Sequence, residues 1–295
     1  MLRVFVMGCP RGGTTLTQRL VAERLGLYTL PETRFFANMI GNTEERMFPQ
    51  TGWTRPAPER RRSRLREALG RSTGREYVHV TDLPVDRGRK WGSVRAITAR
   101  FTAVLDETAR SAGCAGWLEK SPSHVHYAPA ISRLLPDAWL IHVVRDPQQA
   151  VASIWDAAAK YRDPWGMIYG RVERAVDTWN AATRSSAAMV GRPRQIFLPY
   201  DALAAAPEAV LDAMVARMGV ARAGAAAGPA VIATADEAWK SGAVDGAVAP
   251  AASKWDTALT GDERARAGAM IAPVPAPLEA ELDRFRAVAA EGRAA

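Results

Sequence analysis

Short apolar runs alternate with longer amphipathic stretches along this chain. The runs near residues 2–8 and 138–144 are almost continuously apolar, which predicts strands of a parallel sheet covered on both faces. Further strands are predicted near 27–30, 76–80, 115–119 and 194–199. Helices are predicted near 14–25, 57–70, 93–112, 125–134, 147–160, 166–190, 207–218 and 278–290. This alternation predicts an α/β fold, a three-layer sandwich whose central parallel sheet is flanked by helices and binds ligands at the carboxyl ends of its strands.

The first predicted strand leads into a Gly-rich turn and then a helix, as in a phosphate-binding loop. Gly8 and Gly13 are separated by four residues, as in the Walker P-loop, but Thr14 stands where that loop has Lys. The fold is therefore P-loop-like without the ammonium that a kinase or ATPase places between phosphates. Backbone amides from Gly12 onward, at a helix N-terminus, would hold an anion, and Arg11 is the nearest cation.

A second candidate phosphate site follows the strand near 138–144. Arg145 comes directly after this strand, and Ser153 stands eight residues later in the next predicted helix. The planar guanidinium of Arg145 can grip a phosphate, and the Ser153 hydroxyl can add a donor. Asp146 and Pro147 also suit the first turn of a helix, but helix capping does not account for the Arg.

These segments carry a family resemblance. Residues 9–16, Cys-Pro-Arg-Gly-Gly-Thr-Thr-Leu, resemble the 5′-phosphosulfate loop of sulfotransferases that use 3′-phosphoadenosine-5′-phosphosulfate (PAPS), and 145–153 resemble the family's 3′-phosphate motif. Three further segments follow in the family's order: 118–122 is similar to its K-[ST]-P element, 198–203 to Y-E-D-L, and 253–260 to K-W-x-x-x-L-T.

The resemblance implies a PAPS-dependent sulfotransferase formed by a single domain over residues 1–295. It assigns the donor to one set of residues: Gly12, Gly13, Thr14 and Thr15 for the 5′-phosphosulfate, Arg145 and Ser153 for the 3′-phosphate, Tyr200 for the adenosine, and Arg11 and Lys120 for the charge on the sulfuryl and bridging oxygens. The family's R-K-G triplet is missing before the late Trp, and Lys240 or Lys254 is the substitute to consider.

The candidate general base is Glu32. The tripeptide Glu32-Thr33-Arg34 is similar to an E-T-R element of tyrosylprotein-type sulfotransferases. That resemblance implies that Glu32 takes the acceptor proton and that Arg34, with Phe35 beside it, binds substrate. The alternative is that Glu32 only lies in a turn and pairs with Arg34.

A histidine is the rival base. Cytosolic phenol-type and steroid-type sulfotransferases have His two residues after the motif Lys, and here that position is Pro122. His124 and His126 lie just beyond it. His142, on a core strand, is interpreted as an interior or surface side chain without a catalytic role, and Cys9, without a nearby His, is not favoured as a nucleophile.

Composition limits the partners. The net charge of +8 is explained by a nucleotide donor, so no nucleic acid is expected. The sequence has no apolar run long enough for a membrane span, and the first strand begins so early that we expect no leader or membrane anchor and a cytoplasmic enzyme. Two Cys indicate no disulfide framework. The loop without its Lys predicts that no metal is needed.

The acceptor is predicted to be a small-molecule hydroxyl, with phenol, sugar and alcohol left open, and the oligomeric state stays open. Residues 35–110 are predicted to form the acceptor side and 221–252 a lid or a flexible loop. The Ala- and Arg-rich composition indicates a bacterial source and specialised metabolism. Two other functions are weighed: a small-molecule kinase with a degenerate P-loop, and a non-catalytic nucleotide-binding protein.

Overall fold

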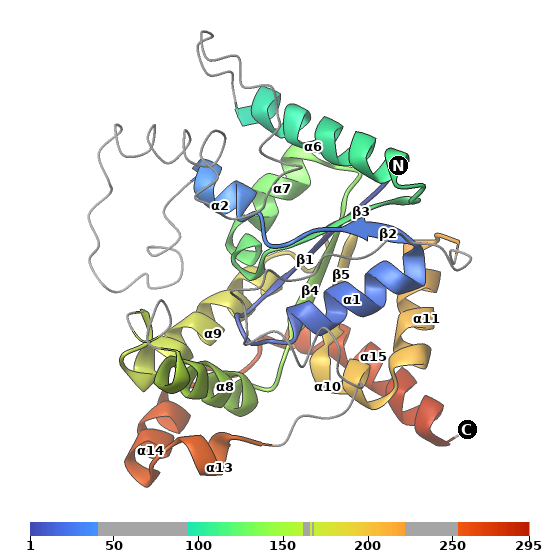
Figure 1. The fold of residues 1–295 in the computed structure, drawn as a ribbon. Helices are drawn as coiled ribbons and strands as arrows, with labels where there is room; N and C mark the ends of the chain where they lie inside the picture. The colour runs from blue at the N-terminus through green and yellow to red at the C-terminus, as the bar shows by residue number, and fades with distance from the viewer. Residues whose placement is uncertain (41–93, 162–165, 167, 222–252, 295) are drawn as a thin grey trace, which may run out of the picture.

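A computed structural model describes residues 1–40, 94–161, 166, 168–221 and 253–294 (Figure 1). Its centre is a parallel sheet with strand order β2-β3-β1-β4-β5. The strands are β1 (Leu2–Gly8), β2 (Leu27–Thr29), β3 (Gly116–Lys120), β4 (Trp139–Val144) and β5 (Gln195–Pro199). The predicted α/β fold is confirmed. The strand predicted near 76–80 lies outside the described residues.

The sheet is covered by helices on both faces. The described helices are α1 (Thr14–Leu25), α2 (Phe35–Ile40), α6 (Val94–Ser111), the 3-10 helix η1 (Pro122–Tyr127), α7 (Ala128–Leu134), α8 (Pro147–Lys160), α9 (Val172–Ala187), α10 (Tyr200–Ala205), α11 (Pro207–Met218), α13 (Trp255–Ala258), α14 (Gly261–Met270) and α15 (Ala276–Ala294). Alternate residues of β1 point to opposite faces, as the pleat requires: Phe5 and Met7 join one buried cluster, Val4 and Val6 the other. Among the described helices, none is long and apolar enough to span a membrane.

Most predicted elements appear, with shifted ends. The helix predicted at 166–190 begins at Val172, and the one predicted at 125–134 starts as the 3-10 turn η1. Four short helices were not predicted, namely α2, α10, α13 and α14. Helix α14 buries only Ala267, so it lacks the apolar period of a core helix, and a capping box between Thr260 and Glu263 defines its start instead.

Two predicted regions are described only in part. Of 35–110, the described portions are α2 and α6, so the helix predicted near 57–70 and most of the expected acceptor side lie outside the described residues. Of the lid or flexible loop predicted at 221–252, residue 221 is described and the rest lies outside the described residues.

Strand β1 is the point where the order of the sheet reverses. The chain passes from β1 to β2 at one edge, returns to β3 beside β1, and then continues to β4 on the other side of β1. In open parallel sheets, ligands bind at the carboxyl ends of strands at such a point. The loops after β1, β3 and β4 are therefore where a site is expected.

The pairing of β1 with β3 needs a glycine at its start. Gly116 lies opposite Leu2, and a Cβ at Gly116 would be 1.9 Å from the Leu2 carbonyl oxygen.

We expect Gly116→Ala to lower the free energy of unfolding by about 1–3 kcal/mol, the usual range for overpacking, as measured by denaturant unfolding. Gly268→Ala is the matched control, because no atom lies within 4 Å of that Cβ. It should be neutral or stabilising, and equal stability of the two variants would contradict the prediction.

Candidate active site

The loop after β1 has the backbone of an anion-binding turn. The Gly12 N–H donates to the Cys9 carbonyl oxygen at 2.9 Å. Arg11 and Gly13 adopt left-handed conformations, with φ of 61° and 93°. Helix α1 begins at Thr14, and its N-cap, Gly13, has no side chain that could cap it. The amides of this first turn are thus oriented as an anion requires.

Tyr200 packs directly on this turn. A Cβ on Gly13 would lie 2.0 Å from Cδ2 of the Tyr200 ring, so only glycine allows this approach. The guanidinium carbon of Arg145 lies 4.8 Å from the centroid of the same ring. The structure therefore brings together Gly13, Arg145 and Tyr200, three residues from distant parts of the chain that were predicted to bind PAPS.

Arg145, after β4, is a cation without a carboxylate partner among the described residues. Its Nη1 donates to the Arg11 carbonyl oxygen at 3.0 Å and its Nη2 to Gln149 Oε1 at 3.1 Å. Its buried Nε has no hydrogen-bond partner. Burial lowers the pKa of Arg145. A desolvated guanidinium that contacts only neutral groups is suited to receive an anion.

Arg11 and Ser153 complete this cluster. Arg11 Nε donates to Ser153 Oγ at 3.2 Å across the gap between the first loop and α8. Burial and the nearby charge of Arg145 lower the pKa of Arg11. The sequence assigned Arg11 to the sulfuryl group, whereas here its guanidinium contacts the residue assigned to the 3′-phosphate. Two guanidinium groups and one hydroxyl thus converge near the N-terminal half of α8.

The first turn of α8 also forms as predicted. The Asp146 carboxylate accepts from the Gln149 N–H at 2.9 Å, and Pro147 occupies the first turn. Both interpretations of this segment, helix cap and cation placement, are thus compatible.

Cys9 lies in the loop after β1. Burial raises the pKa of its thiol, so Cys9 is a poor nucleophile.

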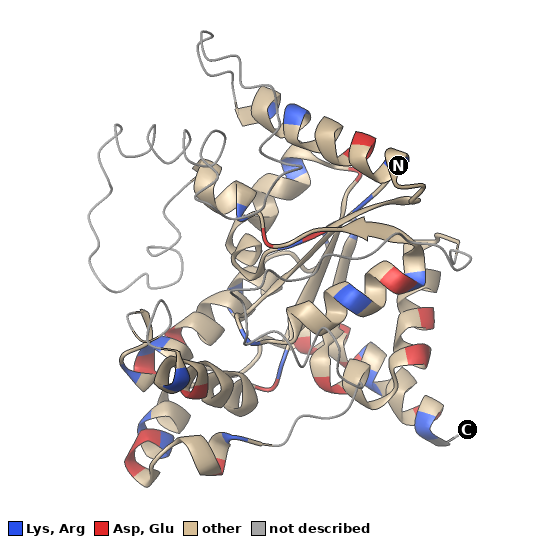
Figure 2. Cartoon of the chain, in the orientation of Figure 1, with Lys and Arg blue, Asp and Glu red and all other residues tan. Residues whose placement is uncertain are grey.

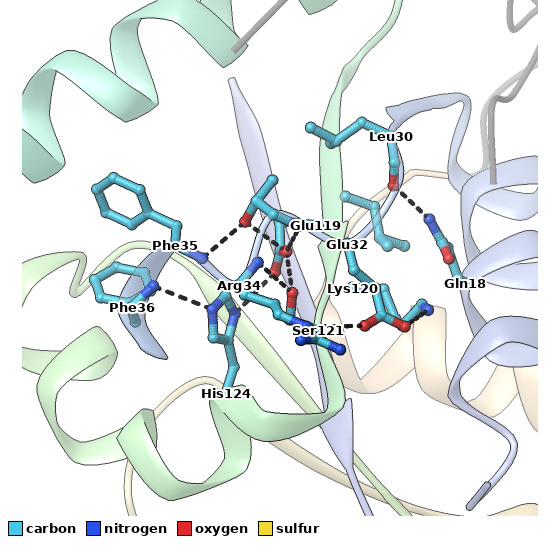
Figure 3. A network of polar contacts seen from close by, with 12 residues as sticks. Gln18, Leu30, Glu32, Arg34, Phe35, Phe36, Glu119, Lys120, Ser121 and His124 are labelled. Carbon is cyan, nitrogen blue, oxygen red and sulfur yellow. Dashed lines mark hydrogen bonds and ion pairs between the residues drawn. The ribbon is translucent and has the colours of Figure 1, made fainter. Parts of the chain in front are cut away.

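A second cluster lies after β2 and at the end of β3 (Figure 3). Lys120 Nζ donates to Glu32 Oε1 at 2.6 Å. The Lys120 side chain is fully buried, and that of Glu32 is 13% exposed. Lys120 lies opposite Val6 in the sheet, near the end of the strand that precedes the phosphate loop. The structure therefore pairs the predicted base with a predicted cation.

The two predicted substrate-binding residues differ in exposure. Arg34 has a side chain that is 66% exposed, and its Nε lies 3.9 Å from Glu32 Oε2. Phe35 is buried, and its ring stacks on Phe101 with centroids 3.9 Å apart. Arg34 is thus open to an acceptor. Phe35 packs in the core, where Phe101 covers its ring.

The rival histidines are buried and engaged. The Phe36 N–H donates to His124 Nε2 at 3.2 Å, so this nitrogen is engaged by the backbone of another segment. His126 Nδ1 lies 3.0 Å from Ser185 Oγ. His142 lies between Ser186 and Gln195, and burial lowers its pKa to about 4, so of the two interpretations, interior or surface, the structure shows the interior one.

Lys254 lies beside the same helix as Ser153. Its Nζ forms an ion pair with Asp156, which stands three residues after Ser153 on α8. This placement keeps Lys254 a candidate for the missing R-K-G contact, whereas Lys240 lies outside the described residues. Within the part of the chain that is described, no group of three or more His, Cys, Asp or Glu is arranged to hold a metal.

Sequence reasoning missed Glu119. Most charged residues lie on helices, and the sheet is largely free of them (Figure 2). The charged residues of the described strands are Arg3, Glu119 and Lys120. Glu119 is fully buried, and a buried carboxylate inside a core strand needs a compensating network. A Glu directly before the motif Lys, inside a predicted core strand, was the signal that could have identified it.

Comparison with known proteins agrees with this architecture. The model of the family described as "Sulfotransferase family" matches residues 3–223. The chain therefore belongs to the sulfotransferase family, and it is a transferase of that class. No curated protein sequence matches it.

Solved structures have a similar fold. The sulfotransferase domain of the Synechococcus PCC 7002 olefin synthase is 18% identical, with a TM-score of 0.50, and the alignment covers 97% of this chain and 94% of that one. A sulfotransferase from Alicyclobacillus acidocaldarius is 16% identical, with a TM-score of 0.48 and coverage of 97% and 99%. At 18% identity, the likeness to the olefin synthase domain concerns the fold alone. No conclusion about this chain is drawn from the Alicyclobacillus structure, because its TM-score is 0.48.

Proposed function

We propose that this protein transfers the sulfuryl group of PAPS to a hydroxyl of a small-molecule acceptor, with Glu32 as the general base. The observation that carries the proposal is the contact between Lys120 Nζ and Glu32 Oε1, placed at the end of the strand next to the phosphate loop. A cation for the departing oxygen and a carboxylate for the incoming hydroxyl then stand side by side.

The transfer is an in-line displacement. The acceptor hydroxyl loses its proton to Glu32 while its oxygen forms a bond to sulfur. The bond between sulfur and the bridging oxygen breaks, and 3′-phosphoadenosine 5′-phosphate (PAP) leaves with the electron pair of that bond. Lys120 stabilises the negative charge that develops on the bridging oxygen. The first-turn amides of α1 hold the 5′-phosphate, and no group other than donor and acceptor is consumed.

The cluster around Ser153 supports the choice of donor. A 3′-phosphate would replace water around Arg145 and Arg11, two partly buried guanidinium groups close to each other. Their mutual repulsion falls when an anion binds between them. ATP and ADP have no phosphate at this position of the ribose, so the cluster favours PAPS over them. Tyr200, beside Gly13 and Arg145, is proposed to contact the adenosine.

We expect Arg145→Ala to weaken PAP binding about ten- to a hundredfold, because a charge-assisted hydrogen bond contributes roughly 1.5–3 kcal/mol. Titration calorimetry with PAP and ADP measures the effect. ADP affinity should change little, which controls for the contact between Arg145 and the loop carbonyl of Arg11. Arg145→Lys should lie between wild type and Ala. Equal losses for PAP and ADP would show that Arg145 only supports the loop.

We expect turnover to persist in the presence of a chelator. A sulfuryl group carries less charge than a phosphoryl group, and the loop has Thr14 in place of the Walker Lys. The assay is transfer from PAPS with and without excess EDTA, across phenols, sugars and alcohols. Activity that disappears with EDTA and returns with Mg²⁺, together with ATP consumption, would favour the kinase alternative.

We expect Glu32→Gln to reduce turnover by about two to four orders of magnitude, the usual contribution of a positioned base. PAP affinity should stay near wild type, because the substitution is isosteric and lies outside the phosphate loop. Glu107→Gln is the matched control, since Glu107 is an exposed carboxylate on α6. Near-full turnover of Glu32→Gln would refute the assignment of the base, and loss of PAP binding as well would indicate a structural role.

A further inference from the structure

The segment that follows Glu32 is held by successive backbone hydrogen bonds (Figure 3). The Thr33 N–H donates to Glu119 Oε1 at 3.1 Å, and the Arg34 N–H donates to Ser121 Oγ at 2.9 Å. The Phe36 N–H donates to His124 Nε2 at 3.2 Å. The acceptors belong to β3, to η1 and to Ser121 between them, so residues 33–36 are docked on a different part of the chain.

Two fully buried groups form the base of this network. Glu119 Oε1 also accepts from Thr33 Oγ1 at 2.8 Å and from Ser121 Oγ at 2.6 Å. Glu119 Oε2 lies 2.9 Å from His124 Nδ1, although their alignment falls short of a regular hydrogen bond. Burial raises the pKa of Glu119, but His124, Ser121 and Thr33 outweigh it, and the net direction is downward. An ionised carboxylate therefore holds the segment from inside the core.

The held segment includes an unfavourable backbone conformation. Arg34 has a φ of 49°, in the left-handed region that residues other than glycine seldom adopt. Such conformations persist only where the surroundings enforce them, and they concentrate at functional sites. Here the Arg34 N–H is fixed by Ser121, two residues from the Glu32 carboxylate.

The other side of Glu32 is fixed as well. Gln18 Nε2, on α1, donates to the Leu30 carbonyl oxygen at 2.9 Å and to Thr29 Oγ1 at 2.6 Å. The backbone around Glu32 is thus tied to the phosphate-loop helix before it and to β3 after it. Its position relative to Lys120 depends on both ties.

Helix capping alone does not explain this arrangement. Thr33 Oγ1 accepts from the Phe35 N–H at 3.1 Å, which is an ordinary local contact at the start of α2. A short helix needs no more than such a side chain. Burying the Glu119 carboxylate and the His124 imidazole is energetically unfavourable. Both side chains come from elements other than α2.

We propose that Glu119 and His124 are positioning residues for the base: through the amides of Thr33 and Phe36 they hold the Glu32 carboxylate against Lys120 Nζ. The proposal rests on the proposed function, in which Glu32 takes the acceptor proton. Glu119 and His124 are both fully buried and act on Glu32 through the backbone. Their contribution is to keep one carboxylate oxygen in place, where a displacement of about 1 Å can cost roughly a hundredfold in rate.

The sharpest test compares two substitutions at Thr33. Thr33→Val removes the hydroxyl that links Glu119 to the Phe35 amide while keeping the shape of the side chain, and Thr33→Ser keeps the hydroxyl. We expect Thr33→Val to lower kcat about ten- to a hundredfold, with PAP affinity within about twofold of wild type. Thr33→Ser should retain most of the turnover. Amide exchange of residues 33–36, followed by NMR, should be faster in Thr33→Val than in Thr33→Ser.

Other outcomes would overturn the proposal. A purely structural role predicts that Thr33→Val loses thermal stability but keeps kcat at temperatures well below unfolding. If Glu32→Gln abolishes turnover while Thr33→Val is fully active, the base stands and the positioning role is wrong. If Glu32→Gln is active, the proposed function of Glu32 is wrong and the positioning role falls with it. A Thr33→Ser variant as impaired as Thr33→Val would also contradict the role of the hydroxyl.

Discussion

The parallel pairing of β1 with β3 and β4 is the constraint on which the site depends. Because the strands run in one direction, the phosphate loop, the Lys120 end of β3 and the Arg145 end of β4 all lie on the same side of the sheet, at the carboxyl ends of its strands. The pairing itself needs close approach of backbones, which is why Gly116 stands opposite Leu2. A shift of register by one residue would turn Lys120 and Glu119 each to the face of the sheet that it does not occupy now, and would separate both from the segment after Glu32.

Two cations are buried at these strand ends, and their positive charges have different surroundings. Lys120 is fully buried and already contacts a carboxylate, that of Glu32. Arg145 contacts a backbone carbonyl, an amide oxygen and an aromatic ring, all of them neutral. Burying a charge without an opposite charge is unfavourable, so the Arg145 cluster is the one that gains most from an incoming anion. This asymmetry agrees with a division between a donor-binding cluster and a reacting pair.

The pair of Glu119 and His124 illustrates how a buried polar network specifies geometry. The rings of Phe5 and Phe36 pack edge-on against the His124 ring, and the low polarity of that environment makes each satisfied hydrogen bond stronger. A core of the same volume without these groups would still pack. It would offer no acceptors to the amides of residues 33–36, and Glu32 would lose the fixed backbone next to it.

The sequence by itself determined the described strands, the Gly-rich turn between β1 and α1, and the family, because apolar period and short motifs are local signals. It also identified Glu32, Lys120, Arg145 and Ser153 as candidates. Only the tertiary structure decided which groups meet: Arg11 contacts Ser153, Phe35 packs on Phe101, and Glu119 anchors the segment after Glu32. These contacts join residues far apart in the chain, and strand order, which no local pattern encodes, brings them together.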